Sequence, residues 1–388
     1  MLKVDDAATQ RRFVQAYDSG TVSGDELGTA LGRYDDLGAD ERAAFDELLA
    51  HTGDDAADFA ARTDAETFDT VVSPCGASVV SSFGGAGVVQ PDSYHSVAAP
   101  SATLAQSGGS CPTLPTDVRD DFVRAVSDID GSELRDVDTQ GALRSIRSFD
   151  RDAQDSATDL IGRVGADGIS VTNDAADLND GSDSLLTEND VDSLVESYEL
   201  YSRPNDAPDT RSVRDIQDDI NQLDAQNVDA LRSAIRGGFG TRSNMKGLDG
   251  EVDIATNLID NNDAVTVRAL SVDGRKMRAD IPGRGMRESE VDIDIQTSDG
   301  RTIGVESKNR DYNDVTFNQL AEDDIEDLTN KFNVVSRNRD EMYVVSQTDN
   351  PQDNEIISAA IEEADFPDDF DSDSDLHFIS PDELSNIE

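Results

Sequence analysis

The sequence predicts a multi-domain protein with a mainly α N-terminal region and a C-terminal α/β domain, in which helices flank a mixed central sheet. Its 388 residues are enough for two or three domains, and its 36% apolar content is enough for at least one buried core. Apolar residues recur at helical spacing along much of the first 236 residues. Beyond the glycine-rich stretch "GGFGTRSNMKG", which is typical of a hinge, strand-like and helix-like segments alternate, so we place a domain boundary near residue 236.

Two segments make up the first part of the chain. Residues 1–69 are acidic and predict short helices broken by Gly and Asp. Residues 70–115 carry few charges and many Gly, Ser and Pro, which is typical of a linker or a loop-rich segment. Cys75 and Cys111 both lie in this segment, and the sequence leaves open whether they are two thiols or a disulfide.

A second helical region is expected over residues 116–236. Thr116 and Asp117 can cap its first helix. The apolar stripe of that helix comprises Val118, Phe122, Val126 and Ile129. Two further stripes at helical spacing, over residues 213–223 and 228–235, favour helices that pack into a core or form a short coiled segment.

The last domain, residues 237–388, shows two periodicities. The strand-like segments are 264–270, 289–296, 302–308, 341–347 and 376–380. The segments with helical spacing are 248–260, 316–332 and 353–364. This alternation predicts the mixed sheet and its flanking helices.

The net charge of the chain excludes few classes of function. The chain has 83 acidic and 32 basic residues and a formal net charge of −51, which resembles the surface chemistry of proteins from extreme halophiles. The acidity therefore does not by itself indicate a basic partner. Three scattered histidines disfavour a histidine-based zinc site or a Ser/His/Asp triad. Apolar runs of about 18 residues are absent and the N-terminus lacks a secretory core, so we expect no membrane span and a cytoplasmic protein of a halophile.

One window of the sequence departs from this acidic background. Residues 231–310 hold 13 basic and 13 acidic residues, whereas the other 308 residues hold 19 basic and 70 acidic ones. A locally basic surface is what a polyanion-binding face requires, and arginines that cap strands and helices would give the same count. Of these two interpretations we favour phosphate binding.

The turn "TSDGR" decides which residues of two adjacent strands face each other. A two-residue loop would set Asp292 beside Ser307 and would mix apolar and charged residues on both faces. A three-residue loop, with Gly300 in the left-handed conformation, sets Asp292 opposite Glu306. This second register leaves the other face to Val291, Ile293, Ile295, Ile303 and Val305. Because pattern and turn chemistry agree on it, we predict the second register.

Two opposed carboxylates have a chemical consequence. Directly opposite residues lie about 4.5 to 5.5 Å apart at Cβ, so the carboxylates repel each other unless a positive charge lies between them. Mg²⁺ fits, because it prefers oxygen ligands and needs only one or two protein carboxylates besides water and substrate. Lys308, two residues beyond Glu306, would point into the site, where an ammonium can orient or deprotonate a water. The alternative is a solvated hairpin face.

Glu251 is the third acidic candidate. At about 100° per residue, the apolar arc of its helix comprises Leu248, Val252, Ile254, Ala255, Leu258 and Ile259. Glu251 falls inside this arc, whereas Asp249 and Asp253 fall outside it. A carboxylate in a buried stripe is costly unless it is paired or binds a metal. Its position therefore indicates a functional role, with a Glu that reaches solvent from the edge of the stripe as the alternative.

These residues resemble the motif of the PD-(D/E)XK nuclease superfamily, which includes many restriction enzymes and archaeal Holliday-junction resolvases. A Gly-x-x-Gly-Glu that ends at Glu251, then Asp292, then Glu306-Ser-Lys308 follow in the order helix, strand, strand, within residues 245–346. The resemblance implies a restriction-endonuclease-like fold for the C-terminal domain. It also implies that Glu251, Asp292 and Glu306 hold Mg²⁺ (or Mn²⁺) and that Lys308 positions the attacking water.

The match contains two departures and a basic insertion. Val291 stands where the motif has a proline before the Asp. Gln319 matches a helical Gln of some members, although on a helix that begins at Phe317 it points away from the apolar stripe. The insertion between Glu251 and Asp292 is expected to contact the substrate or to form an exposed loop. The basic residues that we assign to nucleic-acid binding are Arg275, Lys276, Arg278, Arg284, Arg287 and Arg310.

With this resemblance, the sequence predicts a Mg²⁺-dependent endonuclease that hydrolyses phosphodiester bonds, of DNA rather than RNA. An N-terminal module, a Gly-rich hinge and a terminal nuclease also resemble polymorphic toxins, which would imply export without a cleaved signal and a partner immunity protein. One alternative is a cellular repair, recombination or restriction nuclease of the same fold, as a homodimer where both strands are cut. Another is a non-catalytic nucleic-acid-binding or structural protein of a virus or mobile element, which binding of metal would distinguish from the enzymes.

Overall fold

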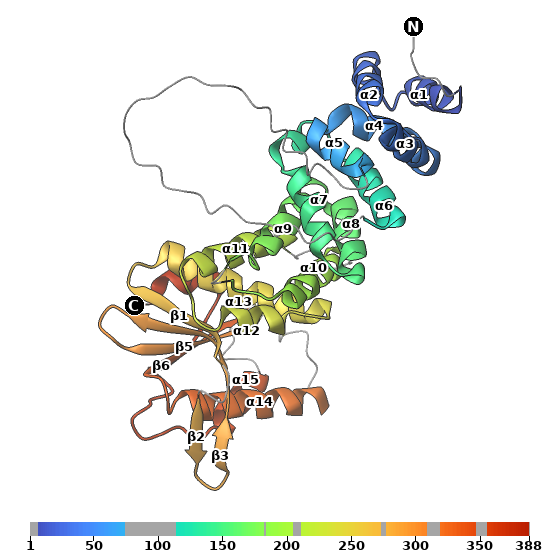
Figure 1. The fold of residues 1–388 in the computed structure, drawn as a ribbon. Helices are drawn as coiled ribbons and strands as arrows, with labels where there is room; N and C mark the ends of the chain where they lie inside the picture. Colours follow the sequence, from blue (N-terminus) through green and yellow to red (C-terminus); the bar gives the residue numbers. More distant parts are fainter. Residues whose placement is uncertain are drawn as a thin grey trace, which may run out of the picture. The chain divides into compact units, whose positions relative to one another are not determined.

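The chain divides into two compact units, and the boundary along the sequence falls between Ser148 and Phe149. The computed structural model describes residues 7–73, 114–181, 184–204, 211–272, 277–308, 319–346 and 355–387. Residues 7–261 are mainly helical, and a mixed five-stranded sheet with helices follows them (Figure 1). Within the described residues, no helix is both long and apolar enough to cross a membrane.

Unit 1 is helical throughout its described part. Its elements are α1 (Ala7–Ser19), α2 (Gly24–Asp36), α3 (Ala39–Thr52), α4 (Asp54–Arg62), α5 (Ala65–Val72), α6 (Thr116–Ser127), a 3-10 helix (Glu133–Asp136) and α7 (Thr139–Ser148). The short helices predicted over residues 1–69 are thus confirmed, and the rings of Phe13, Phe45 and Phe68 pack together in their core. Cys75 and Cys111 lie outside the described residues.

The predicted α6 stripe is confirmed, but the predicted cap of that helix is wrong. The stripe residues Val118, Phe122, Val126 and Ile129 are all buried. The helix begins at Thr116 itself, with Pro115 at the N-cap and no side-chain cap. Thr116 and Asp117 therefore lie in the first turn of the helix. Pro115, whose φ is fixed, precedes that turn and sets the start of the helix.

Six helices precede the sheet in the described part of unit 2. They are α8 (Arg151–Val164), α9 (Ala166–Asp177), α10 (Glu188–Ser202), α11 (Val213–Ala225), α12 (Leu231–Gly237) and α13 (Arg242–Asn261). The stripes predicted over residues 213–223 and 228–235 are buried in α11 and around α12. These helices pack into the core of their unit, which is the simpler of the two interpretations of their spacing.

The two units do not meet near residue 236, where the sequence predicts a boundary. α13 packs against α10, α11 and α12 on one side and against β1, β4 and β5 on the other. A Cβ added to Gly238 would lie 2.8 Å from Leu248 Cδ2, so α12 and α13 approach closely at the glycines. The stretch from Gly237 therefore joins two packed helices, and the helices before it share a core with the sheet.

The five-stranded sheet has the order β1-β4-β5-β6-β7. Its strands are β1 (Val265–Val272), β4 (Val291–Thr297), β5 (Thr302–Lys308), β6 (Glu341–Ser346) and β7 (Leu376–Ile379), and each matches a predicted strand. β1 and β5 run antiparallel to β4, whereas β5, β6 and β7 are parallel. The sheet is therefore mixed, as predicted.

The hairpin between β4 and β5 adopts the predicted register. Ile293 pairs with Val305 and Ile295 with Ile303, which sets Asp292 opposite Glu306 one position further along. Gly300 has a φ of 96°, the left-handed conformation that the three-residue loop requires. The hairpin residues Ile293, Ile295, Ile303 and Val305 are fully buried.

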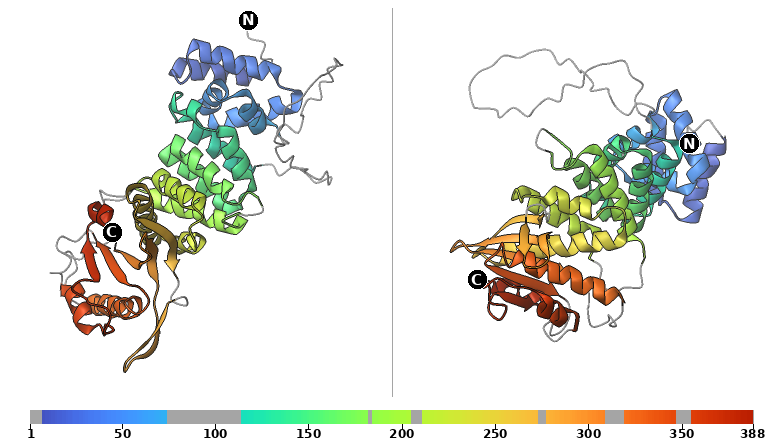
Figure 2. Two further views of the ribbon diagram at one scale, coloured as in Figure 1. Left: turned by 90° about the vertical axis from the view of Figure 1, so that its left-hand side faces the viewer. Right: turned by 90° about the horizontal axis from the view of Figure 1, so that it is seen from below.

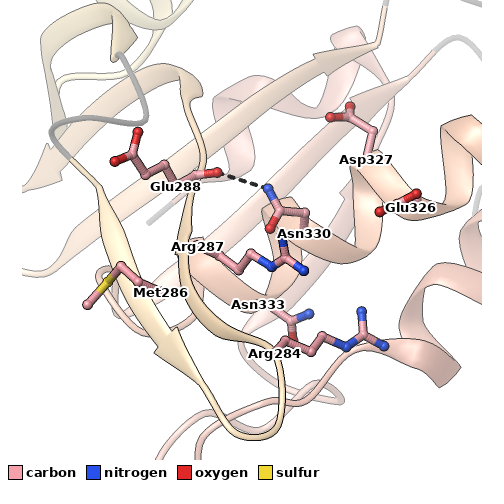
Figure 3. Close-up of a pocket in the computed structure, with 8 residues that line it drawn as sticks. All are labelled: Arg284, Met286, Arg287, Glu288, Glu326, Asp327, Asn330 and Asn333. Carbon is pink, nitrogen blue, oxygen red and sulfur yellow. Dashed lines mark hydrogen bonds between the residues drawn. The ribbon is translucent and has the colours of Figure 1, made fainter.

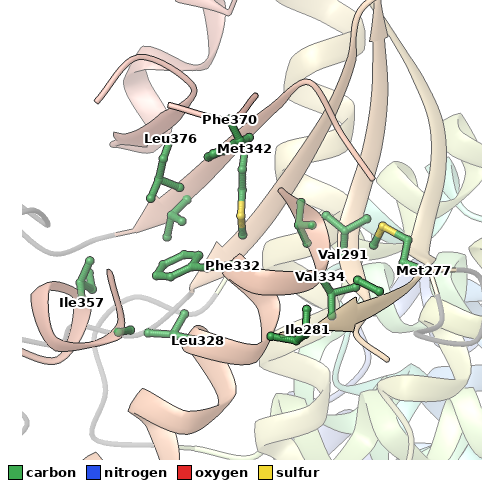
Figure 4. Close-up of a cluster of buried hydrophobic side chains, with 14 of the residues drawn as sticks. Met277, Ile281, Val291, Leu328, Phe332, Val334, Met342, Ile357, Phe370 and Leu376 are labelled. Carbon is green, nitrogen blue, oxygen red and sulfur yellow. The ribbon is translucent and has the colours of Figure 1, made fainter. Parts of the chain in front are cut away.

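Helices cover both sides of the sheet (Figure 1). α13 lies on one side; α14 (Gln319–Val335) and α15 (Glu355–Glu363) lie on the other. Phe332 and Leu328 of α14 pack against Met342, Leu376 and Ile357 in one apolar cluster (Figure 4). A short 3-10 helix (Pro381–Asn386) contacts α13 and β7.

A two-stranded hairpin projects from the five-stranded sheet (Figure 2). It consists of β2 (Arg278–Ile281) and β3 (Gly285–Glu288), which lie in the predicted basic insertion. Ala279 and Ile281 of β2 are buried in the cluster that α14 covers, whereas all four residues of β3 are exposed. The described part of the insertion is thus an ordered ribbon anchored on α14.

Candidate active site

Asp292 and Glu306 lie side by side on adjacent strands, as the register predicts. Asp292 is 8% exposed and Glu306 is fully buried. The backbone N–H of Ser307 donates a hydrogen bond of 2.7 Å to Asp292 Oδ2. This bond holds the Asp292 carboxylate against the carboxyl end of β5, beside Glu306. Burial of two neighbouring carboxylates requires a positive charge close to them.

Lys331, on α14, supplies a positive charge at this place. Its ammonium forms an ion pair with Glu306 Oε1, and its Nζ lies 3.8 Å from Asp292 Oδ1. Lys331 is 6% exposed. Burial would by itself lower the pKa of Lys331, but the charges of Glu306 and Asp292 outweigh that effect and raise the pKa well above its ordinary value. The side chain is therefore a charged ammonium at neutral pH.

Gly304 allows α14 to lie close enough to β5 for this contact. A Cβ at this position would lie 2.9 Å from both Val291 Cγ2 and Val335 Cγ1, closer than real Cβ atoms approach other groups. Glycine at 304 thus permits the close packing of Val335 on the sheet. Lys331 is one helical turn before Val335, on the same side of α14, and so reaches Glu306.

Glu251 joins the pair from the other covering helix. Its Oε2 accepts a hydrogen bond of 2.7 Å from Ser271 Oγ at the end of β1. Burial, followed by the charges of Asp292 and Glu306, raises the pKa of Glu251 to about 8 although the Ser271 hydroxyl opposes the shift. Glu251 thus lies near the two carboxylates with which the resemblance groups it, and its role as a metal ligand stays a prediction.

Asp294 shows that acidity on β4 is not enough to make a site residue. It lies two residues beyond Asp292 and is 5% exposed. Arg339 Nε donates a hydrogen bond of 2.7 Å to its Oδ1, and Arg268 lies 3.9 Å from its Oδ2. Two guanidinium groups thus balance this carboxylate, whereas Asp292 and Glu306 share one described ammonium with Glu251 nearby.

Asp249 lies in a buried environment, although the sequence places it outside the apolar arc of its helix. It is 4% exposed, accepts a hydrogen bond of 2.8 Å from Tyr201 Oη, and lies 3.2 Å from Arg211. The reason is that α10 and α11 cover the side of α13 that faces away from the sheet. Ion pairs of Arg211 with Asp219 and Asp253 complete this network, which is separate from Glu251.

The other predicted site residues divide into three groups. Lys308 and Gln319 lie at the end of β5 and the start of α14, and the structure does not describe their side chains. Arg275, Lys276 and Arg310 lie outside the described residues. On the β2–β3 hairpin, Arg278 pairs with Glu288, while Arg284 and Arg287 line a pocket beside α14 (Figure 3).

Sequence reasoning missed Lys331, although the sequence contained a signal for it. The chain has only five lysines, and Lys331 lies inside the apolar stripe formed by Leu328, Phe332 and Val335. Like Glu251, this lysine is a charged residue within a buried stripe, which is costly unless the charge has a partner. Its partner could not be identified, because the pairing of α14 with β5 depends on long-range packing.

The donor chemistry of the site fits Mg²⁺. Carboxylate oxygens are the ligands that this ion prefers, and the pKa of Glu251 is raised by burial and, next, by the negative charges of Asp292 and Glu306. In the described part of the chain, no group of three or more His, Cys, Asp and Glu side chains is placed to hold a metal ion. The pair Asp292 and Glu306 is sufficient for Mg²⁺, because this ion keeps several waters and substrate oxygens as ligands.

Comparison of the chain with protein-family models, with curated proteins and with solved structures gave no match.

Proposed function

We propose that the C-terminal α/β part of unit 2 is a metal-dependent nuclease that hydrolyses phosphodiester bonds. The observation that supports this proposal most strongly is the convergence of Glu251, Asp292 and Glu306 from three elements on one place at the carboxyl end of β5. Two buried carboxylates with a third, half-buried one near them destabilise a fold unless a cation balances them, so their presence indicates selection for a site. The arrangement agrees with the resemblance to the PD-(D/E)XK nucleases.

Asp292 and Glu306 would hold the ion, with Glu251 as a nearby third carboxylate. When bound, Mg²⁺ supplies a Lewis acid that polarises the phosphate and lowers the pKa of a bound water. The remaining work falls to residues of the chain. Ser307 fixes the orientation of Asp292 through its backbone N–H, and Ser271 fixes that of Glu251 through its hydroxyl.

The two lysines near the site have different proposed roles. Lys308 follows Glu306 by two residues on β5 and remains the proposed group that positions the attacking water. Lys331 is held between Glu306 and Asp292 and stays protonated, so it acts as a fixed positive charge and not as a base. A fixed ammonium there stabilises the negative charge that develops on the phosphate during hydrolysis.

A second candidate function is non-catalytic nucleic-acid binding or a structural role. The ion pair between Lys331 and Glu306 favours it, because an internal ammonium can neutralise Glu306 without any metal. Binding of divalent metal distinguishes the two candidates. A metal-free role predicts that the pair persists unchanged in the presence of Mg²⁺.

The wider biological setting is also a proposal. DNA is the favoured substrate over RNA, and a repair, recombination or restriction nuclease and a polymorphic toxin with an immunity protein both agree with such a site. The toxin interpretation depended on a hinge near residue 236, and that stretch joins α12 and α13 within one unit. The nuclease proposal does not depend on this hinge.

Cleavage of nucleic acid by the full chain tests the proposed function. Plasmid DNA and total RNA are incubated with the protein in molar KCl, with Mg²⁺, with Mn²⁺ or with EDTA. We expect cleavage that requires metal and is lost in both Glu306→Gln and Lys308→Ala. Metal-independent cleavage, or full activity in either variant, would contradict the proposed assignment of the site.

A further inference from the structure

A pocket of about 480 Å³ lies between the β2–β3 hairpin and α14 (Figure 3). Arg284, Met286 and Arg287 of the hairpin and Asp327, Asn330 and Asn333 of α14 line it, and the acidic side chains Glu288 and Glu326 complete the lining. The volume falls within the range of pockets that hold small ligands. The pocket adjoins the carboxylate site, because Asp327 lies one helical turn before Lys331 and its charge acts on that ammonium.

Two arginines of the pocket have no acidic partner among the described residues. In the described part of unit 2, every arginine except Arg242, Arg284 and Arg287 forms an ion pair with Asp or Glu. Arg242 lies over the ring of Tyr201 and donates to the carbonyl of Arg203, so it has a structural role. Arg284 makes one long hydrogen bond of 3.5 Å to the Glu363 carbonyl.

Such arginines are the exception in the described part of unit 2, whereas in the described part of unit 1 Arg12 and Arg42 also form no ion pair and donate to backbone carbonyls instead. Arg284 and Arg287 differ from those arginines because their side chains line a pocket, where a guanidinium without a carboxylate partner can bind an anion from outside the protein. Arg284 and Arg287 are three residues apart on one hairpin and line the same pocket. Each guanidinium carries a planar fork of N–H donors, which suits the oxygens of a phosphate.

The rest of the pocket suits a base better than a second phosphate. Asn330 Nδ2 donates a hydrogen bond to the Glu288 carbonyl, and Asn333 Oδ1 accepts one from the Asp365 N–H. Within the described structure, this leaves Asn330 Oδ1 as an acceptor and Asn333 Nδ2 as a donor. Asp327 adds a carboxylate acceptor at the end near Lys331. Amides and carboxylates form hydrogen bonds with the edges of bases. Met286, 64% exposed on β3, points away from α14 (Figure 3) and offers an apolar surface at the edge of the pocket.

We propose that this pocket binds one unpaired nucleotide of the substrate strand, next to the bond that is cut. The inference rests on the proposed function and adds the class of substrate: single-stranded nucleic acid, or a duplex with an unpaired end or flap. A base enters a pocket only when it has left the stack of a duplex. Arg284 and Arg287 bind its phosphate, and the amides of α14 contact its base.

Binding of short fluorescent oligodeoxynucleotides to the full chain in EDTA tests the proposal without cleavage. The probes are a single strand, a blunt duplex of the same sequence, and that duplex with an unpaired flap. We expect the single strand and the flap to bind at least about tenfold more tightly than the blunt duplex. Equal or tighter binding of the blunt duplex would overturn the proposal and would indicate that the hairpin lies in a duplex groove.

Substitutions in the hairpin locate the binding. Arg284→Ala and Arg287→Ala should each weaken single-strand binding about tenfold and reduce the slope of log affinity against log salt by about 0.7. Met286→Ala should weaken binding without changing that slope. Arg214→Ala, which removes a paired arginine from α11, is the matched control and should change neither quantity. Unchanged binding in both hairpin arginine variants would overturn the proposal.

The outcome is separable from that of the proposed function. Selective binding of unpaired strands through Arg284 and Arg287, without any cleavage in Mg²⁺, would support the pocket and contradict the nuclease. Metal-dependent cleavage with no preference for unpaired strands would support the nuclease and contradict the pocket.

Discussion

The ammonium of Lys331 on α14 is paired with the fully buried carboxylate of Glu306 on β5. Removal of one partner of a buried ion pair leaves the other as an uncompensated charge. Lys331→Met is therefore expected to lower the free energy of unfolding by roughly 3–5 kcal/mol in EDTA. Denaturant unfolding measures this loss, and the double variant Lys331→Met with Glu306→Gln should recover most of it because neither charge remains.

The same variant also reports on the cation. Saturating Mg²⁺ is expected to restore part of the lost stability in Lys331→Met, because an ion that binds the folded state stabilises it by mass action. No effect of Mg²⁺ on Lys331→Met would count against a cation at Asp292 and Glu306.

Gly304 sets the distance between β5 and α14. Gly304→Ala introduces a Cβ only 2.9 Å from Val291 Cγ2 and Val335 Cγ1. We expect a loss of roughly 1–3 kcal/mol in unfolding free energy and reduced cleavage, because α14 must shift and carry Lys331 with it. Gly247→Ala is the control, since nothing lies within 4 Å of a Cβ there. Equal stability of both variants would show that the close approach is not required.

The raised pKa of Glu251, about 8, makes stability depend on pH. The folded state keeps the Glu251 proton at pH values where the unfolded state has released it, so this contribution is present below the ordinary Glu pKa and is lost as pH rises through about 8. Between about pH 5 and pH 9 in EDTA, the wild type should lose on the order of 4 kcal/mol more than Glu251→Gln. Parallel pH dependence of the two proteins would contradict the shift.

The position of the boundary between the units predicts which fragment folds. Residues 149–388 form one compact unit, in which α10, α11 and α12 cover α13. A fragment of residues 237–388 would expose the side of α13 that carries the buried Asp249. We expect cooperative unfolding of fragment 149–388 and its loss in fragment 237–388, measured by circular dichroism in molar KCl. A cooperative transition in the shorter fragment would place the boundary near residue 236 after all.

The parts of the site that sequence could predict are those set by local rules. The pairing of Asp292 with Glu306 follows from strand alternation and from the left-handed Gly300, and both are readable along the chain. Glu251 was identifiable because helical spacing places it within an apolar arc. The five strands of the large sheet were also predictable, because strand-like segments are recognised from the local sequence alone.

The parts that sequence could not predict depend on contacts between distant elements. The contact of Lys331 with Glu306 requires α14 to pack on β5 at Gly304. The boundary was misplaced because a change of periodicity at residue 237 marks a change of secondary structure and not a change of core. The β2–β3 hairpin was missed because all of β3 is exposed and shows no apolar alternation.

Binding of Mn²⁺ to the metal-free full chain tests most directly whether the buried carboxylates form a cation site. Electron paramagnetic resonance counts bound Mn²⁺ in molar KCl for the wild type, for Asp292→Asn, and for Asp294→Asn as the matched control on the same strand. We predict a tightly bound ion in the wild type and in Asp294→Asn, whose carboxylate already pairs with Arg339, and its loss in Asp292→Asn. Equal Mn²⁺ binding by all three proteins would show that the ion does not bind at Asp292 and would contradict the proposed site.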